Sequence, residues 1–104
     1  MSVELLWWEG CPSWPDALAQ LQREMRAAGL DPDSIELRQV ESDEQAERER
    51  FPGSPTIRVN GEDVVPPHGE PASLTCRVYA RRDGSISPLP DPDDLRAALE
   101  RSKP

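Results

Sequence analysis

The chain opens with a short apolar run that stops directly before a helix signal, and this junction constrains the fold more than any other feature. Residues 3–8 read Val-Glu-Leu-Leu-Trp-Trp, a nearly continuous apolar run typical of a strand buried on both faces of a parallel or mixed sheet. Glu9, Gly10 and Pro12 then interrupt the run. The sequence therefore predicts an α/β protein whose first strand leads into a helix.

The helix signal begins at Ser13. Ser13 can cap the helix, Asp16 follows three residues later as a short capping box, and Pro15 is tolerated in the first turn. Cys11 consequently lies at a strand-to-helix junction, where unpaired N–H groups and the positive end of the helix dipole favour thiolate over thiol. Apolar residues then recur at helical spacing up to Gly29, a natural stop; they are Trp14, Ala17, Leu18, Leu21, Met25 and Ala28.

The remaining sequence predicts more elements of the same two kinds. Asn60-Gly61 is the strongest short hairpin signal, between apolar stretches on either side. With 104 residues, the chain is expected to form one domain over residues 1–104. We expect a mixed central sheet of four to five strands flanked by about three helices. The further strands are expected at residues 34–40, 56–59, 62–65 and 74–80, and the further helices at residues 42–50 and from residue 91 onward.

Three stretches carry a resemblance to known proteins: Trp-Glu-Gly-Cys-Pro at 8–12, Ser-Pro-Thr-Ile-Arg-Val at 54–59 and Cys-Arg-Val-Tyr at 76–79. The chain resembles the thioredoxin and glutaredoxin superfamily, and more narrowly a family of small thioredoxin-like proteins, some with names tied to alkylmercury lyase. The resemblance implies a thioredoxin-like fold with Cys11 facing a cis Ser54–Pro55 bond, and an extended substrate paired with the backbone of Ser54. It implies these substrate-binding residues: Pro12, Trp14, Ser54, Pro55 and Thr56.

The second cysteine of a dithiol motif is missing beside the first. Residues 11–14 read Cys-Pro-Ser-Trp, so Trp14 stands where a dithiol oxidoreductase of the superfamily carries cysteine. A monothiol mechanism remains, in which a second thiol releases a mixed disulfide. Cys76 alternates with Val78 and Ala80 on one face of the strand expected at 74–80, which favours core packing. If that strand starts near Cys11, Cys76 is instead a candidate resolving thiol, with no native disulfide expected at rest.

Three functions from different classes are consistent with these residues. The first is a monothiol thiol–disulfide redox protein with Cys11 as nucleophile and a thiol-containing protein or a small glutathione-type thiol as partner. The second is a redox-inactive module that binds a peptide or thiol ligand in the same groove. The third is a protein that handles thiophilic metals or organomercurials. No cofactor and no structural zinc are expected, because the spacing of Cys11, His68 and Cys76 matches no compact zinc pattern.

Charge and hydropathy restrict the partners and the compartment. The net charge of −8 disfavours binding to nucleic acid and to anionic membranes. The opening apolar run is too short for a signal peptide and lacks a basic flank, and no stretch is long enough to cross a bilayer. We therefore expect a cytoplasmic protein, in which cysteines are more often thiols than structural disulfides.

Overall fold

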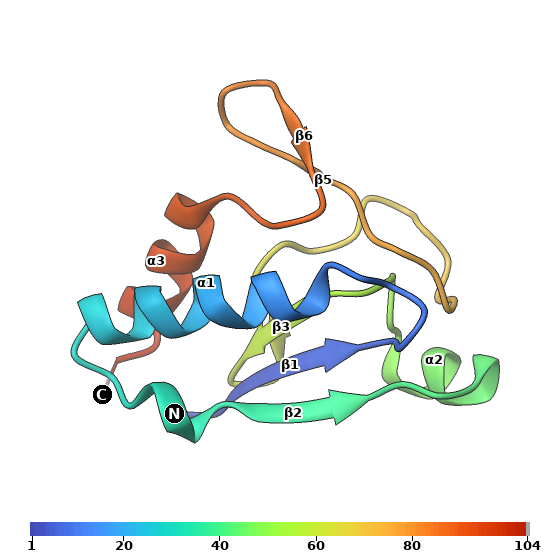
Figure 1. The fold of residues 1–104 in the computed structure, drawn as a ribbon, viewed down its shortest axis with the longest axis horizontal. Helices are drawn as coiled ribbons and strands as arrows, with labels where there is room; N and C mark the ends of the chain where they lie inside the picture. The colour runs from blue at the N-terminus through green and yellow to red at the C-terminus, as the bar shows by residue number, and fades with distance from the viewer. Residues whose placement is uncertain (104) are drawn as a thin grey trace.

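A four-stranded mixed sheet lies at the centre of the protein (Figure 1), whose computed structural model describes residues 1–103. β1 pairs in parallel with β2 and antiparallel with β3, and β3 pairs antiparallel with β4, giving the order β2-β1-β3-β4. The expected α/β class with a mixed central sheet is confirmed. The strands are β1 (Val3–Trp7), β2 (Glu36–Gln39), β3 (Thr56–Val59) and β4 (Glu62–Asp63).

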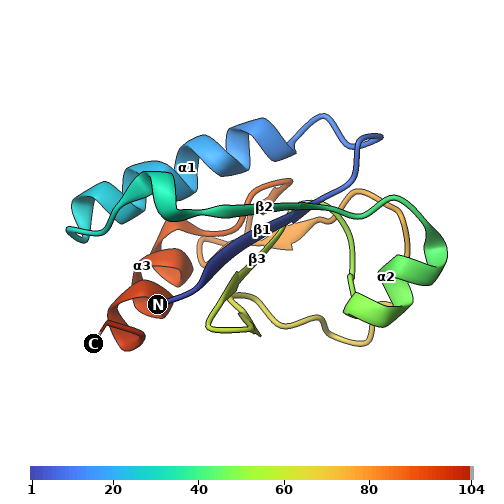
Figure 2. The same ribbon diagram turned by 90° about the horizontal axis from the view of Figure 1, so that it is seen from below.

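Helices cover both faces of this sheet. α1 (Trp14–Ala27) and α3 (Pro92–Arg101) pack on one face, whereas α2 (Asp43–Glu49) packs on the other. Figure 2 shows α1 and α2 on opposite sides of the strands. Successive strand residues point to opposite faces, so Leu5 joins the core under α1 and α3 while Leu6 joins Phe51 in the core under α2. The sheet is therefore buried on both faces along β1, as the apolar run predicts.

The helix ends follow their sequence signals with one exception. The Ser42 hydroxyl accepts the Gln45 N–H at 3.1 Å, and the Asp91 carboxylate accepts the Asp93 N–H at 2.9 Å, so α2 and α3 are capped as expected. The cap predicted at Ser13 is wrong: Ser13 occupies the N-cap position of α1 but makes no side-chain capping bond. Its hydroxyl instead helps to lower the pKa of the Cys11 thiol.

The strand predicted at residues 74–80 is largely wrong. Only β5 (Tyr79–Ala80) forms, and it pairs with β6 (Ile86–Ser87) in a hairpin separate from the central sheet. Residues 75–77 run instead beside Ser54, forming an isolated parallel bridge. The physical reason is that Ser54 belongs to an irregular loop before β3, so the pairing cannot extend into a ladder.

The edges of the sheet are shorter than predicted. β2 and β4 cover only part of the ranges 34–40 and 62–65, and a short 3₁₀ helix, η1 (Pro32–Ser34), precedes β2. β2 is an edge strand, which leaves Leu37 47% exposed. Within residues 1–103, no helix has the length and apolar character needed to span a membrane.

Candidate functional site

Cys11 is held in the tight turn that joins β1 to α1. Its N–H donates to the Trp8 carbonyl at 3.1 Å, which closes the turn. Gly10 is needed inside it, because a Cβ at that position would lie 2.4 Å from the indole of Trp8. The Cys11 side chain is only 1% exposed, and its thiol donates to the Ser54 carbonyl at 3.3 Å. The turn therefore places the buried Cys11 sulfur against the loop that precedes β3.

The loop at residues 53–56 is fixed firmly against the end of β1. The Ser54–Pro55 peptide is cis, which confirms that expectation. The Ser54 hydroxyl accepts the Trp8 N–H at 3.1 Å, and the Thr56 hydroxyl donates to the Gly53 carbonyl at 2.6 Å. The hydroxyl of Tyr79 donates to the Pro55 carbonyl from the other side. Ser54, Pro55 and Thr56 are all buried, so this loop forms a rigid wall beside Cys11.

Cys76 and Cys11 both lie next to Ser54. The Ser54 N–H donates to the Thr75 carbonyl at 2.8 Å, and the Arg77 N–H donates to the Ser54 carbonyl at 2.8 Å, which places Cys76 beside Ser54. The two thiols are close enough for each to shift the pKa of the other, and neither forms a disulfide. This placement agrees with the alternative in which the segment at residues 74–80 starts near the site, and a resolving role for Cys76 stays a prediction.

The core-packing interpretation of Cys76 is wrong, because Cys76 is exposed. The inward positions of this segment are taken by Arg77 and Tyr79. The guanidinium of Arg77 lies 4.5 Å from the centre of the Tyr79 ring and donates to the Val65 carbonyl. The residues do alternate between two faces, but the large amphipathic side chains occupy the inner face and the small residues, including Cys76, the outer one.

The two thiols have opposite pKa shifts. Burial alone raises the pKa of Cys11, but hydrogen bonds from the Cys76 thiol, the Ser13 N–H and the hydroxyls of Ser13 and Ser54 outweigh it, so that pKa lies below its ordinary value. The pKa of Cys76 is raised to about 11 by its hydrogen bond to Cys11, by burial and by the negative charge of the Cys11 thiolate. The first proton therefore leaves from Cys11, and Cys76 holds the second.

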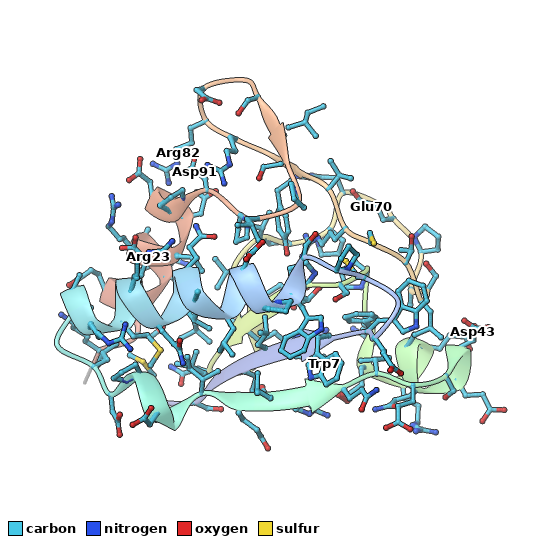
Figure 3. All side chains as sticks on the ribbon, in the orientation of Figure 1. Trp7, Arg23, Asp43, Glu70, Arg82 and Asp91 are labelled. Atoms are coloured by element: carbon cyan, nitrogen blue, oxygen red, sulfur yellow. The ribbon has the colours of Figure 1, made fainter. Side chains whose placement is uncertain are left out.

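No hydrogen bond joins Trp14 or Pro12 to the Cys11 sulfur in the described part of the chain. Trp14 stacks on Trp7 with ring centroids 4.3 Å apart and an angle of 26° between the planes. Figure 3 shows Trp7 at the end of β1 below the first turn of α1. This stacking anchors the start of the helix, whereas Pro12 is exposed between Cys11 and Ser13. Substrate contacts by Pro12 and Trp14 stay a prediction.

The backbone of Ser54 already has partners within the chain. Its N–H and its carbonyl bond to Thr75 and Arg77, the two residues that flank Cys76. An external strand could pair with Ser54 only if residues 75–77 moved away. No sequence pattern indicates this pairing, or the contact between Ser13 and the sulfur, because both depend on how separate segments meet in the folded chain.

A cavity of about 320 Å³ opens beside Cys76. Its walls come from the loop after α2 and from residues 70–78; Glu70, which is labelled in Figure 3, belongs to the second of these segments. A larger hollow of about 540 Å³ lies between α2 and the β3–β4 hairpin, and its walls contain no thiol. The residues that line the smaller cavity include Pro52, Glu70, Thr75, Cys76, Arg77 and Val78.

Comparisons of the chain with models of protein families, with curated proteins and with solved structures found no match. The chemistry of the paired thiols is therefore the basis for assigning a function.

Proposed function

We propose that the protein is a thioredoxin-like thiol–disulfide redox protein in which Cys11 is the nucleophile. The element order supports this fold: strand, helix, strand, helix, two strands and helix is the order that the resemblance implies, with η1 and the β5–β6 hairpin added. The position of Cys11 between β1 and α1, beside the loop that carries Pro55, also agrees with it. The fold and the thiol site thus support the same class of protein.

The placement of Cys76 beside Cys11, through the bonds that Ser54 makes with both segments, carries the proposal. A buried thiol that only packs has a raised pKa, because burial disfavours the thiolate, yet hydrogen bonds from Cys76, Ser13 and Ser54 bring the pKa of Cys11 below its ordinary value. These donors stabilise the thiolate, which is the species that attacks disulfides. Cys76 also supplies the second thiol that Trp14 does not provide, so the pair can work as a dithiol without a local motif.

The proposed reaction balances in atoms and electrons. The Cys11 thiolate attacks one sulfur of a partner disulfide, breaks that disulfide and releases the first partner thiolate. Cys76 then loses its proton and attacks the Cys11 sulfur, which forms the Cys11–Cys76 disulfide and releases the second thiolate. The partner disulfide gains two electrons, the cysteine pair loses two, and the released thiolates take up the protons.

The test uses a chromogenic aromatic disulfide as the oxidant and follows the release of both chromophore groups. Wild type should release both groups and end as an intramolecular disulfide at a yield independent of protein concentration. The matched variant Cys76→Ser should release one group and keep the other on Cys11. Wild type that keeps a group on Cys11, or that does not react while folded, would contradict the proposal and favour the redox-inactive module.

Capture of a soft metal ion is a second candidate, because two adjacent thiols also form a two-coordinate site for such ions. Among the described residues 1–103, no group of three or more His, Cys, Asp and Glu side chains is placed to hold a metal ion. The ion would therefore be cargo held by Cys11 and Cys76. Titration calorimetry with a soft ion should then give one ion per protein, and either single cysteine variant should lose this stoichiometry.

A further inference from the structure

We propose that a low-molecular-weight thiol reduces the oxidised protein by attacking Cys76, entering through the cavity beside that residue. This inference rests on the proposed function. It assigns the point of attack to Cys76 and not to Cys11, which lies just before the start of α1. It also assigns the class of the reducing partner, a small thiol in place of an extended peptide.

The two cysteines differ in their exposure to solvent. Cys11 is 1% exposed and is enclosed by the turn after β1 and by the loop carrying Ser54. Cys76 is exposed and lines the cavity. An incoming thiolate must approach the attacked sulfur along the disulfide axis, and the exposed Cys76 sulfur offers the less obstructed approach.

The chain itself excludes an extended peptide from the site. Residues 75–77 already take both backbone hydrogen bonds of Ser54, each at 2.8 Å. They occupy the position that the sequence resemblance implies for a substrate strand, so Cys76 is presented to Cys11 as an internal substrate. The remaining space is the cavity of about 320 Å³, which is near the lower end of the usual range for small-molecule sites.

The chemistry favours the same direction of attack. When an external thiolate bonds to Cys76, the Cys11–Cys76 bond breaks and Cys11 leaves as a thiolate. Hydrogen bonds from Ser13 and Ser54 lower the pKa of this thiol, and they remain available when Cys76 is bonded to the external sulfur; a thiol of lower pKa leaves faster. A second external thiolate then attacks the external sulfur of the mixed disulfide, forms the partner's disulfide and frees Cys76, which takes a proton.

The first experiment maps the mixed disulfide. Oxidised wild type is mixed with glutathione as the probe thiol, quenched in acid within the reaction time, alkylated and analysed by peptide mass spectrometry. Glutathione on Cys76 with alkylated Cys11 is the expected product. Glutathione on Cys11 with alkylated Cys76 would overturn the inference and leave the redox function standing, whereas failure to form the Cys11–Cys76 disulfide at all would overturn the proposed function itself.

The second experiment tests the cavity. Val78 is 63% exposed and lines it, so Val78→Trp narrows the cavity without disturbing the core. Ile86 is 74% exposed on β6 and serves as the matched control. Val78→Trp should slow reduction by glutathione by roughly tenfold, equivalent to about 1.4 kcal/mol of activation free energy, and Ile86→Trp should leave it unchanged. Equal rates in both variants would contradict entry through this cavity.

Discussion

Removing one hydroxyl group, in Tyr79→Phe, tests the structural support of the site most directly. Tyr79 is 3% exposed, donates to the Pro55 carbonyl and accepts a hydrogen bond of 3.2 Å from Arg77. Phenylalanine keeps the ring and its stacking with the guanidinium but leaves the Pro55 carbonyl without this donor. An unpaired buried acceptor costs about 1–3 kcal/mol, so we expect the free energy of unfolding to fall by about 2 kcal/mol.

Urea unfolding followed by tryptophan fluorescence measures this loss. For a domain of this size, a loss of about 2 kcal/mol lowers the melting temperature by about 10 °C. The same variant should change the rate of Cys11 alkylation, because the Pro55 loop forms one wall around that sulfur. A loss of under about 0.5 kcal/mol, below the usual value of one hydrogen bond, would refute the assigned role of the hydroxyl.

Val59→Ala is the control for a general loss of stability. Val59 is 4% exposed and lies at the end of β3 away from Pro55, in the core under α1 and α3. Its truncation should destabilise the protein by about 2 kcal/mol through lost burial and a small cavity. Cys11 alkylation should stay at the wild-type rate in Val59→Ala. If both variants change the alkylation rate equally, Tyr79 acts through stability alone.

Three further predictions concern pH and the turn. Tyr79 is the only tyrosine, and burial raises its pKa to about 12, so its ultraviolet absorbance should titrate near that value. The pKa of Tyr79 in the folded protein exceeds the ordinary value of 10.0, so burying the neutral phenol stabilises the fold fully below pH 10.0. This contribution is lost as the pH rises to about 12, and alkaline unfolding curves should show a loss of about 3 kcal/mol. Cys76→Ala should move the midpoint of Cys11 alkylation to higher pH, and Cys76→Ser, which keeps a donor, should move it less; equal midpoints would show that Cys76 donates nothing to the thiolate. Gly10→Ala should cost about 1–3 kcal/mol in urea unfolding because the new Cβ would overlap the ring of Trp8, and a neutral effect would contradict the close approach of Trp8 to this turn.

Elements specified by neighbouring residues could be predicted from the sequence. β1 and α1 follow from an apolar run and a helical period, and the hairpin after β3 follows from Asn60-Gly61, whose φ angles of 53° and 82° fit a tight turn. The position of Cys11 at the strand-to-helix junction follows from the same two patterns. Each of these depends on contacts within a few residues.

Features set by contacts between distant segments could not be predicted. Alternation in residues 74–80 defines two faces but not which face meets the core, and Arg77 reaches inward because Val65 and Tyr79 supply partners for its guanidinium. Ser13 carries an ordinary capping signal, yet its hydroxyl caps no helix N–H group and instead stabilises the thiolate of Cys11, two residues earlier. One hydroxyl can serve either the helix N–H groups or the Cys11 sulfur, and the conformation of the folded turn determines which of them it serves.

The two departures from the resemblance, the missing local cysteine and the occupied backbone of Ser54, have one physical explanation. A resolving thiol must reach the Cys11 sulfur, and residues next to Cys11 are one way to place it there. Pairing residues 75–77 with Ser54 is another, since it fixes Cys76 by two backbone hydrogen bonds of 2.8 Å. Trp14 is then free to stack on Trp7 and hold the start of α1. In the proposed function, the pairing that supplies the second thiol also fills the place of an extended substrate, so a resolving Cys76 and the exclusion of peptides both follow from one contact.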